Sequence, residues 1–409
     1  MPWLEANVVN LRMEFVLRAL RDDLPFSTLC ADYGISPKTG YKWKERFLQH
    51  GMDGLTDLSR RPHHCPVRVP EELLMELVQL KTKHEKWGPK KLRDLLLRME
   101  LPVKVPSLST LKRLLLRMGL VKPQRRRRVR DGGRISQDVV AVEPNDVWTV
   151  DFKGWWYSSE RERIQPLTVR DMYAKYLLGA VALPDSRSET VRAVFERLFT
   201  TYGLPKVIKS DNGTPFACRN SLQGLTALSV WWVALGIGLD RSRPGCPGDN
   251  AAHERMHRDL AAEVEGVATG NLKQQQAALA AWRHEFNEER PHEALGQRFP
   301  AEVYRRSPRR YDPRPVILEY PARYFRRKVS QVGVIKIEGR PIRLSVALRD
   351  WHVGLQPLEP GLFRVWFANL ELGEVDVAHE KFLPASTVKT NIAGNADSVY
   401  DRIKALPMS

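Results

Sequence analysis

Three acidic residues in three different local settings constrain this chain more than any other feature. Asp151 ends the apolar run 147–150, and Asp211 follows the run 207–210 and opens the turn at Asn212-Gly213. Glu254 lies instead in the charged segment 250–264, which has helical spacing. Two carboxylates at strand ends and one on a helix can together bind hard divalent cations. From 145 to about 265, three strand-like runs, a helical run, another strand and further helices fit an α/β layer with one central sheet.

Each acid taken alone has an ordinary structural explanation. Asp151 is also what a simple strand end would show, and Asp211 is suited to a side-chain turn before Gly213. Two further acids of the same region, Asp171 and Asp185, are typical of turns. A functional reading of the three acids therefore depends on what else the chain carries.

The positive charge of the chain is concentrated near its N-terminus. The formal net charge of the 409 residues is +17, and residues 1–130 hold 27 Lys and Arg against 14 Asp and Glu, an excess of 13. A basic module ahead of a nearly neutral body indicates a polyanionic partner, most simply nucleic acid. Charge alone leaves a merely well-solvated surface as the alternative.

The cysteines and apolar runs argue against several protein classes. The four cysteines stand singly and form no C-x-x-C pair, so neither a zinc ribbon nor a disulfide framework is indicated. The first residues lack the apolar core of a signal peptide. The apolar run 230–239 is about half a membrane span. We therefore expect a protein of a reducing cytoplasm without a membrane partner.

Residues 12–49 have the pattern of three short helices. Ser36 is placed to cap the third helix, 38–49, after a glycine turn at Gly34. Its apolar stripe contains Gly40, Trp43 and Phe47, and its basic face contains Lys38, Lys42 and Arg46. This pattern is typical of a helix-turn-helix whose second helix enters a major groove. An ordinary amphipathic helical hairpin is the alternative.

A second helical block covers residues 71–119. The segment Trp87-Gly88-Pro89 begins one helix, and residues 107–118 form another with Lys112, Arg113 and Arg117 outside its leucine stripe. Two helix-turn-helix units could read a longer site than one. The following linker contains Arg125, Arg126, Arg127 and Arg128, which cannot be buried and are expected to contact phosphates. Nuclear targeting is the alternative for these arginines.

These patterns predict a multidomain chain: an N-terminal all-α tandem helix-turn-helix, a central α/β core and a C-terminal small β-barrel. The barrel is inferred from short β-rich runs between Gly and Pro turns. The expected divisions are helix-turn-helix 1 at 1–50, a linker at 51–70, helix-turn-helix 2 at 71–121, a basic linker at 122–144, the core with its trailing helices at 145–310, the barrel at 316–385 and a tail at 386–409.

The local settings of the acids resemble the three motifs of DDE transposases. They are Val147–Asp151, Ser210–Phe216 and Asp249–Arg258, and they are most similar to the bacterial insertion-sequence branch that shares its catalytic core with retroviral integrases. The segment Phe286–Leu295, with Arg290-Pro291-His292, is similar to one that follows the core in that branch. The helical arms resemble those of the same branch, so the likeness covers roughly residues 12–310.

The resemblance implies both a fold and a reaction. Asp151, Asp211 and Glu254 would be the catalytic, metal-binding triad of a ribonuclease-H-like core, with two Mg²⁺ or Mn²⁺ ions about 3.5–4 Å apart. Water would nick the end of the element, and the freed 3′-hydroxyl would attack target DNA, without any small-molecule cofactor. The implied partners are double-stranded DNA, as element ends and target, and further copies of the chain, at least a dimer on DNA. The implied location is the bacterial cytoplasm, at the nucleoid.

One feature departs from the family pattern. The 42 residues from 212 to 253, between the second and third acids, exceed the commonest family spacing. We expect the excess in the loop around Arg219–Ala227. The zinc-binding N-terminal motif of retroviral integrases is absent and is replaced by the helical arms.

Two alternatives to this function stay open. His253-Glu254-Arg255-Met256-His257 is an H-E-x-x-H pattern, in which two histidines on one helix face can bind zinc, with Glu285 or Glu288 as a distant third ligand. On the transposase interpretation, His257 and Arg258 are instead expected to face DNA one turn beyond Glu254. The second alternative is a catalytically inactive, DNA-binding regulator derived from a transposase.

Overall fold

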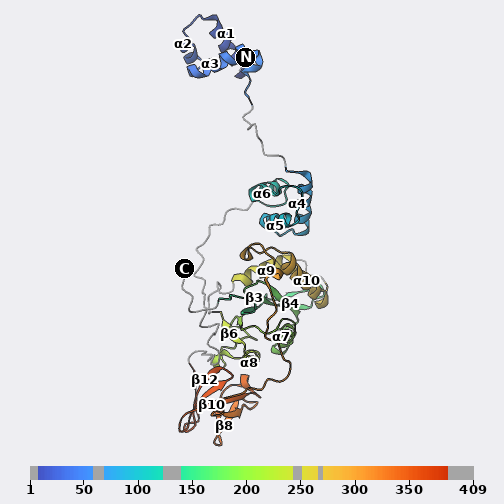
Figure 1. The fold of residues 1–409 in the computed structure, drawn as a ribbon, viewed down its shortest axis with the longest axis vertical. Coiled ribbons are helices and arrows are strands. Elements are labelled where there is room, and N and C mark those ends of the chain that lie inside the picture. Colours follow the sequence, from blue (N-terminus) through green and yellow to red (C-terminus); the bar gives the residue numbers. More distant parts are fainter. Residues whose placement is uncertain (1–7, 59–68, 123–139, 243–250, 266–269, 386–409) are drawn as a thin grey trace. The chain divides into compact units, whose positions relative to one another are not determined.

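The computed structural model describes residues 8–58, 69–122, 140–242, 251–265 and 270–385 (Figure 1). The chain divides into two compact units, residues 1–69 and 70–409. Among the described residues, no helix is both long enough and apolar enough to cross a membrane.

The first unit is a three-helix bundle formed by α1 (Val8–Arg21), α2 (Phe26–Asp32) and α3 (Pro37–His50). The hydroxyl of Ser36 caps α3 by accepting the Thr39 amide at 3.2 Å, as the sequence predicts. A Cβ at Gly40 would lie 2.6 Å from Cys30 Sγ and 2.9 Å from the Phe15 ring. Glycine is therefore what lets α3 pack closely against α1 and α2.

The predicted boundary at residue 50 is too early. A 3₁₀ turn, η1 (Gly51–Leu55), follows α3, and Leu55 is fully buried in the bundle core. Arg12 fixes this turn by donating to the Leu55 carbonyl at 2.8 Å and pairing with Asp57 at 3.0 Å. The glycine-rich composition predicted a linker, but burial of one leucine side chain makes the segment part of the bundle.

The second helical block opens the other unit with α4 (Glu71–Lys83), α5 (Pro89–Arg98) and α6 (Leu108–Arg117). Gly88 precedes α5 with Pro89 in its first turn, and Ser107 caps α6. The three helices bury a small leucine core, namely Leu73, Leu77, Leu92, Leu96, Leu111 and Leu115. The expected basic residues of α6 remain on its exposed side.

The centre of this unit is one mixed sheet (Figure 1). Its main path runs β2-β3-β1-β5-β6, with β4 pairing β3. β3 is antiparallel to its neighbours, whereas β1, β5 and β6 run parallel. The strands are β1 (Val147–Phe152), β2 (Trp156–Tyr157), β3 (Arg163–Asp171), β4 (Leu177–Leu183), β5 (Val207–Ser210) and β6 (Gly238–Arg241).

Helices cover both faces of this sheet. On one face α7 (Ser188–Tyr202) and α8 (Ala227–Ala234) bury a core with Trp148 and Val150. On the other, α9 (Ala251–Glu263) and α10 (Leu272–His284) pack on Ile164 and Leu177. A π turn η5 (Glu285–Glu289) extends α10, and the 3₁₀ turn η6 (Glu293–Leu295) and α11 (Pro300–Val303) follow. This arrangement is the predicted α/β layer.

The C-terminal part is an open antiparallel sheet, so the predicted β-barrel is not confirmed. Its order is β13-β12-β11-β10-β7, and β8 and β9 pair only with each other. The β8–β9 hairpin, with four residues in each strand, does not provide the ladder that would close the edges at β7 and β13. The strands are β7 (Phe325–Lys328), β8 (Val334–Ile337), β9 (Arg340–Arg343), β10 (His352–Glu359), β11 (Leu362–Phe367), β12 (Leu370–Asp376) and β13 (Lys381–Pro384), with a 3₁₀ turn η7 (Val346–Leu348).

The segment between the second and third acids joins this C-terminal sheet to the core. A 3₁₀ turn, η2 (Leu222–Gly224), lies in it, and Gln223 donates to the Glu371 carbonyl at 2.8 Å. Leu225 is buried in the same apolar cluster as the inner face of the C-terminal sheet, where Val230 and Val233 of α8 also lie. The loop around Arg219–Ala227 is therefore a packed connection between the two sheets.

Candidate active site at one end of the central sheet

The register of the central sheet places the first two acids at one edge. In the parallel pair of β1 and β5, the last matched residues are Thr149 and Lys209. Asp151 and Asp211 each come two positions after that pair, at the carboxyl ends of neighbouring strands. Adjacent strands lie about 4.8 Å apart, so the two acids occupy neighbouring positions at the same end of the sheet.

Residues of β3 and α9 contact Asp151. The side chain of Asp151 is 18% exposed, and its Oδ2 lies 3.9 Å from Nδ1 of His257. Thr168, directly opposite Asp151 on β3, donates its hydroxyl to the Asp151 carbonyl at 3.1 Å. The same hydroxyl lies 2.8 Å from Nε2 of His257. A buried threonine therefore connects the strand that carries the first acid to the helix that carries the third.

His257 is not where the sequence placed it. It was expected to face DNA, but its side chain is 11% exposed and packs over β1 and β3. Burial, with a smaller effect of the nearby Lys153, lowers the pKa of His257 to about 4. The ring is therefore neutral at physiological pH. The correction follows from helix geometry, since the side of α9 that carries Met256 and Leu260 also buries His257.

Asp211 is exposed at the start of the turn after β5. Its Oδ1 accepts the Gly213 amide at 3.2 Å, which is the side-chain turn that the Asn-Gly sequence suggests. The neighbouring Asn212 donates to the Ser242 carbonyl, and Ser242 in turn donates its amide to the Ser210 carbonyl at 3.0 Å. These bonds fix the turn to the end of β6 while the Asp211 carboxylate remains open to solvent.

Glu254 is an exposed side chain in the first turn of α9. Its helix packs on the sheet through Met256 and Leu260, and Val264, directly after the helix, belongs to the same apolar cluster. The three acids are carboxylates, the ligand type that hard divalent cations prefer. Among the described residues, however, no three His, Cys, Asp or Glu side chains are grouped closely enough to hold a metal ion. The three carboxylates suit a divalent cation chemically, but in this structure they are not gathered into one binding site.

The two histidines of the H-E-x-x-H pattern lie on the buried side of α9. The ring centroids of His253 and His257 are 5.4 Å apart, and burial lowers the pKa of both. Glu285, considered as a third ligand, lies instead 3.6 Å from both His84 and Arg290. The same absence of three grouped ligands applies to zinc in the described part of the chain. Both histidines are buried where α9 packs on the sheet.

Of the two acids that the sequence assigned to turns, Asp171 is the last residue of β3 and Asp185 lies in the loop before α7. Asp171 is fully buried and accepts the Asn145 amide at 2.7 Å and the Ala174 amide at 2.6 Å. Burial raises the pKa of Asp171 to about 6. Asp185 accepts the Arg187 amide at 3.0 Å and the Thr190 hydroxyl at 2.9 Å at the start of α7.

The expected DNA-contacting residues have different surroundings. Lys38 and Lys42 are exposed on α3, whereas Arg46 donates to the Thr56 carbonyl at 2.8 Å and stacks over Trp43. Part of the role of Arg46 is therefore to hold the bundle. On α6 and α9 four of the expected residues are exposed, namely Lys112, Arg113, Arg117 and Arg258. Arg125, Arg126, Arg127 and Arg128 lie outside the described residues.

Sequence reasoning missed two residues that contact the strand of Asp151 or the helix of Glu254. Thr168 is one, and the only sequence signal for it was its position in the strand that pairs with β1. Arg290 is the other: the sequence marked it as part of a helix break, yet its side chain is 1% exposed and pairs with Asp259 and Glu263 of α9. Neither role follows from spacing along the chain, because both depend on contacts between distant elements.

Comparison with known families covers most of the described chain. Residues 11–63 match a helix-turn-helix domain and residues 39–115 a homeodomain-like domain. Residues 141–247 and 235–300 match two models of the integrase core domain. Asp151 and Asp211 fall within the first of these core matches, and Glu254 falls within the second.

Relatives in bacterial insertion elements decide the family. The chain is 31% identical over 256 residues to the uncharacterized 31.7 kDa protein of insertion element IS407 from Burkholderia multivorans, covering 61% of this chain and 87% of the relative. The chain belongs to the DDE transposases of bacterial insertion sequences, with an integrase core. This transposase is also 24% identical over 301 residues to the transposase of insertion sequence IS629 from Shigella sonnei, covering 70% of this chain and 94% of that one.

Solved structures similar to this transposase include two retroviral proteins. The catalytic core of HTLV-2 integrase in complex with magnesium is 12% identical, with a TM-score of 0.32, and covers 41% of this chain and 100% of that one. The core of BIV integrase is 20% identical, with a TM-score of 0.30, and covers 39% of this chain and 93% of that one.

Proposed function

We propose that this transposase binds the terminal inverted repeats of its element and carries out metal-dependent 3′-end cleavage and strand transfer into target DNA. The observation that supports this most is the register of β1 and β5, which puts Asp151 and Asp211 at neighbouring strand ends. The match to the integrase core spans both of these acids and Glu254. The basic helical arms provide the means of binding DNA.

In this proposal Asp151, Asp211 and Glu254 hold two divalent cations, Mg²⁺ or Mn²⁺. When bound, such ions lower the pKa of an attacking hydroxyl or water and stabilise the leaving oxygen of a phosphodiester. The residues of the chain have separate tasks. The carboxylates of Asp211 and Glu254 are exposed and accessible to a DNA strand, whereas Thr168 and His257 fix the backbone and surroundings of Asp151.

The helical arms supply the DNA affinity. Lys38 and Lys42 on α3, with the exposed basic side chains of α6, are placed for phosphate and groove contacts. Both ends of an element must be processed together, so the active assembly is at least a dimer on DNA. Its place of action is the bacterial nucleoid.

An oligonucleotide joining assay tests the catalytic part of this proposal. Labelled terminal-repeat duplex is incubated with target DNA and Mg²⁺ or Mn²⁺, using wild type, Asp151→Asn and Glu254→Gln. Both variants should bind the duplex normally and lose joining by at least a thousandfold. Glu196→Gln, on the exposed side of α7, is the matched control and should join at the wild-type rate.

Joining at wild-type rates by either acid variant would contradict the assignment. Strong repeat binding by the wild type, with no cleavage under any divalent cation, would favour the inactive regulator. Stoichiometric zinc in the purified protein would favour the metalloprotease.

A further inference from the structure

Arg290 is an almost fully buried arginine whose contacts reach the helix of the third acid. Its Nη1 lies 2.9 Å from Asp259 Oδ2, and its Nη2 pairs with Glu263 Oε2. Asp259 and Glu263 are four residues apart on α9, so they share one side of the helix. Two separate nitrogens of one planar guanidinium therefore bind two successive turns of α9.

Arg290 is itself fixed to the central sheet. Asn287, three residues earlier in η5, accepts the Leu177 amide at 2.8 Å and donates to the Leu177 carbonyl at 3.0 Å, at the start of β4. The Arg290 amide donates to the Glu285 carbonyl at 2.9 Å, and Pro291 then keeps Arg290 extended at the end of the π turn. The result is a continuous connection from β4 through Asn287 and Arg290 to α9.

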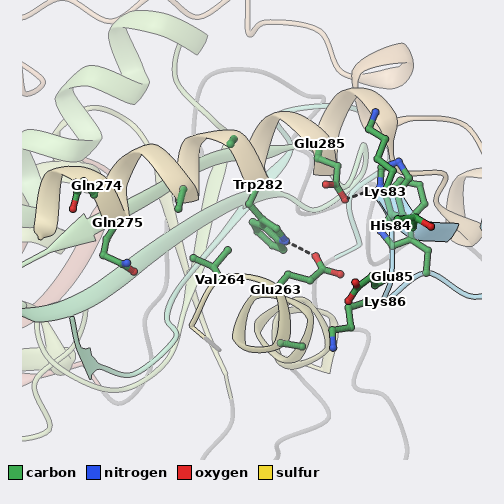
Figure 2. A pocket seen from close by; sticks show the side chains of 15 residues that line it. Lys83, His84, Glu85, Lys86, Glu263, Val264, Gln274, Gln275, Trp282 and Glu285 are labelled. Carbon is green, nitrogen blue, oxygen red and sulfur yellow. Dashed lines mark hydrogen bonds and ion pairs between the residues drawn. The ribbon is translucent and has the colours of Figure 1, made fainter. Parts of the chain in front are cut away.

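Aromatic rings enclose the guanidinium. Its carbon lies 5.5 Å from the Phe286 ring, 5.8 Å from the Trp282 ring and 5.4 Å from the ring of Trp87, which belongs to the second helical block. Trp282 also donates its indole NH to Glu263 Oε2 at 2.6 Å, as Figure 2 shows. A pocket of about 860 Å³ lies beside these groups, between the end of α4 and helices α9 and α10 (Figure 2).

Apolar packing alone leaves the position of α9 along its axis weakly defined. Met256 and Leu260 press the helix onto the sheet, but such contacts tolerate sliding and rotation. A shift of one residue moves a helix by about 1.5 Å and turns it by about 100°, which would carry Glu254 away from the strand ends. A two-point ion pair with two turns of α9 opposes both movements.

We infer that Arg290 is a positioning residue for Glu254, in addition to the Thr168–His257 contact, and that Trp87 of the second helix-turn-helix block, by covering the guanidinium, makes this positioning depend on that block. This inference rests on the proposed function, because Glu254 needs a fixed position only if it acts with Asp151 and Asp211. Arg290 is 1% exposed and pairs with α9, so it acts through that helix.

Hydrogen–deuterium exchange on the intact, metal-free protein tests the inference apart from activity. Arg290→Lys keeps the positive charge but cannot bind both carboxylates with separate nitrogens. Amides of α9 should then exchange at least tenfold faster, while those of α7 are unchanged. Asp259→Asn is a milder second variant, since that carboxylate is 43% exposed, and should accelerate exchange in α9 about threefold.

Arg283→Lys is the matched control. Arg283 lies near the end of α10, seven residues before Arg290, but it contacts the Tyr202 hydroxyl at 3.0 Å and the Leu178 carbonyl rather than α9. It should leave exchange in α9 unchanged. In the joining assay, Arg290→Lys should lower the rate at least tenfold with repeat affinity within twofold of wild type, and Trp87→Leu should lower it about fivefold.

Unchanged α9 exchange in both Arg290→Lys and Asp259→Asn would overturn the inference. Equal acceleration throughout the protein would also overturn it, because that result means general destabilisation. The proposed function fails on a different observation, namely joining at the wild-type rate by Glu254→Gln. That substitution lies on the exposed side of α9 and should leave amide exchange unchanged. The two failures are thus distinguishable.

Discussion

The hydroxyl of Thr168 lies 2.8 Å from Nε2 of His257, and this buried contact joins the middle of the central sheet to α9. The same hydroxyl donates to the Asp151 carbonyl at 3.1 Å. One side chain thus holds the backbone of the first acid and faces the helix of the third. Removing this hydroxyl therefore tests its part in both the stability of the core and the joining reaction.

Thr168→Val keeps the shape of the side chain but removes its hydroxyl. It leaves two buried polar groups without this partner, which should cost about 1–3 kcal/mol of unfolding free energy. Joining of terminal-repeat DNA should fall about tenfold, because the Asp151 backbone is less well fixed. Urea denaturation and the joining assay measure the two effects.

Thr149→Val is the control for this substitution. Thr149 lies on β1 and donates its hydroxyl to the Arg170 carbonyl at 3.2 Å rather than to the Asp151 carbonyl. It should lose similar stability and keep its joining rate. If both valine variants lower joining equally, the contact between Thr168 and His257 has no special part in the reaction.

Salt dependence tests the DNA-binding face of α3. Lys42→Gln should weaken binding to the terminal repeat and reduce the slope of log affinity against log salt by about one, as expected for one lost phosphate contact. Lys44→Gln is the control, since Lys44 donates to the Ala19 carbonyl at 3.3 Å within the bundle. Fluorescence anisotropy at several salt concentrations measures both slopes, and equal slopes for Lys42→Gln and wild type would place Lys42 away from DNA.

The strand-end acids and the helical arms were predictable because local pattern determines them. An apolar run that ends in Asp151 predicts a strand whatever surrounds it, and Ser36 followed by Pro37 predicts the start of α3. The role of Arg290 was not predictable, because it depends on Asp259 and Glu263 meeting it across the fold. His257 was misplaced for the same reason: helical spacing shows which residues share a side of α9, and it does not show which side the sheet covers.

The C-terminal barrel shows a further limit of pattern reasoning. Alternating β-rich runs predict strands, and the strands are there, but closure depends on whether the edge strands meet. Here the inner face of the open sheet is covered by α8 and Leu225 instead. Packing against the core thus shields the inner apolar face of this sheet, as closure would in a barrel. The strand sequences alone do not distinguish an open sheet from a closed one.

Histidines whose pKa is lowered in the fold should make the stability of the core pH-dependent. Burial lowers the pKa of His292 to about 3, against about 6.5 for an unfolded histidine. Below pH 6.5 the unfolded chain binds a proton that the folded chain does not, so the stability contributed by this group falls as the pH drops. Between pH 7.5 and 5.5 one such histidine removes about 1.4 kcal/mol of unfolding free energy.

His292→Phe should therefore flatten the pH dependence of unfolding by that amount. Urea denaturation at pH 7.5 and 5.5 measures it, with the exposed His284→Phe as the control that leaves the slope unchanged. The lowered pKa of the buried His257 likewise reduces the free energy of unfolding as the pH drops. Asp171 opposes them, because its raised pKa of about 6 makes acidification below that value stabilising. An unchanged slope in His292→Phe would mean that this histidine is protonated in the fold.

The connection between the two sheets can be tested at Leu225. This side chain is 1% exposed and lies in the apolar cluster that covers the C-terminal sheet, so Leu225→Ala should cost about 2–5 kcal/mol. Leu222→Ala, at a partly buried position on the same cluster, should cost less than half as much. Because the loop around Arg219–Ala227 packs against the C-terminal sheet, Leu225→Ala should also make residues 316–385 more sensitive to protease than α7. Mass spectrometry of the fragments would show this. Equal losses at both leucines, or cleavage that begins in α7, would mean that the segment between the second and third acids does not hold the C-terminal sheet to the core.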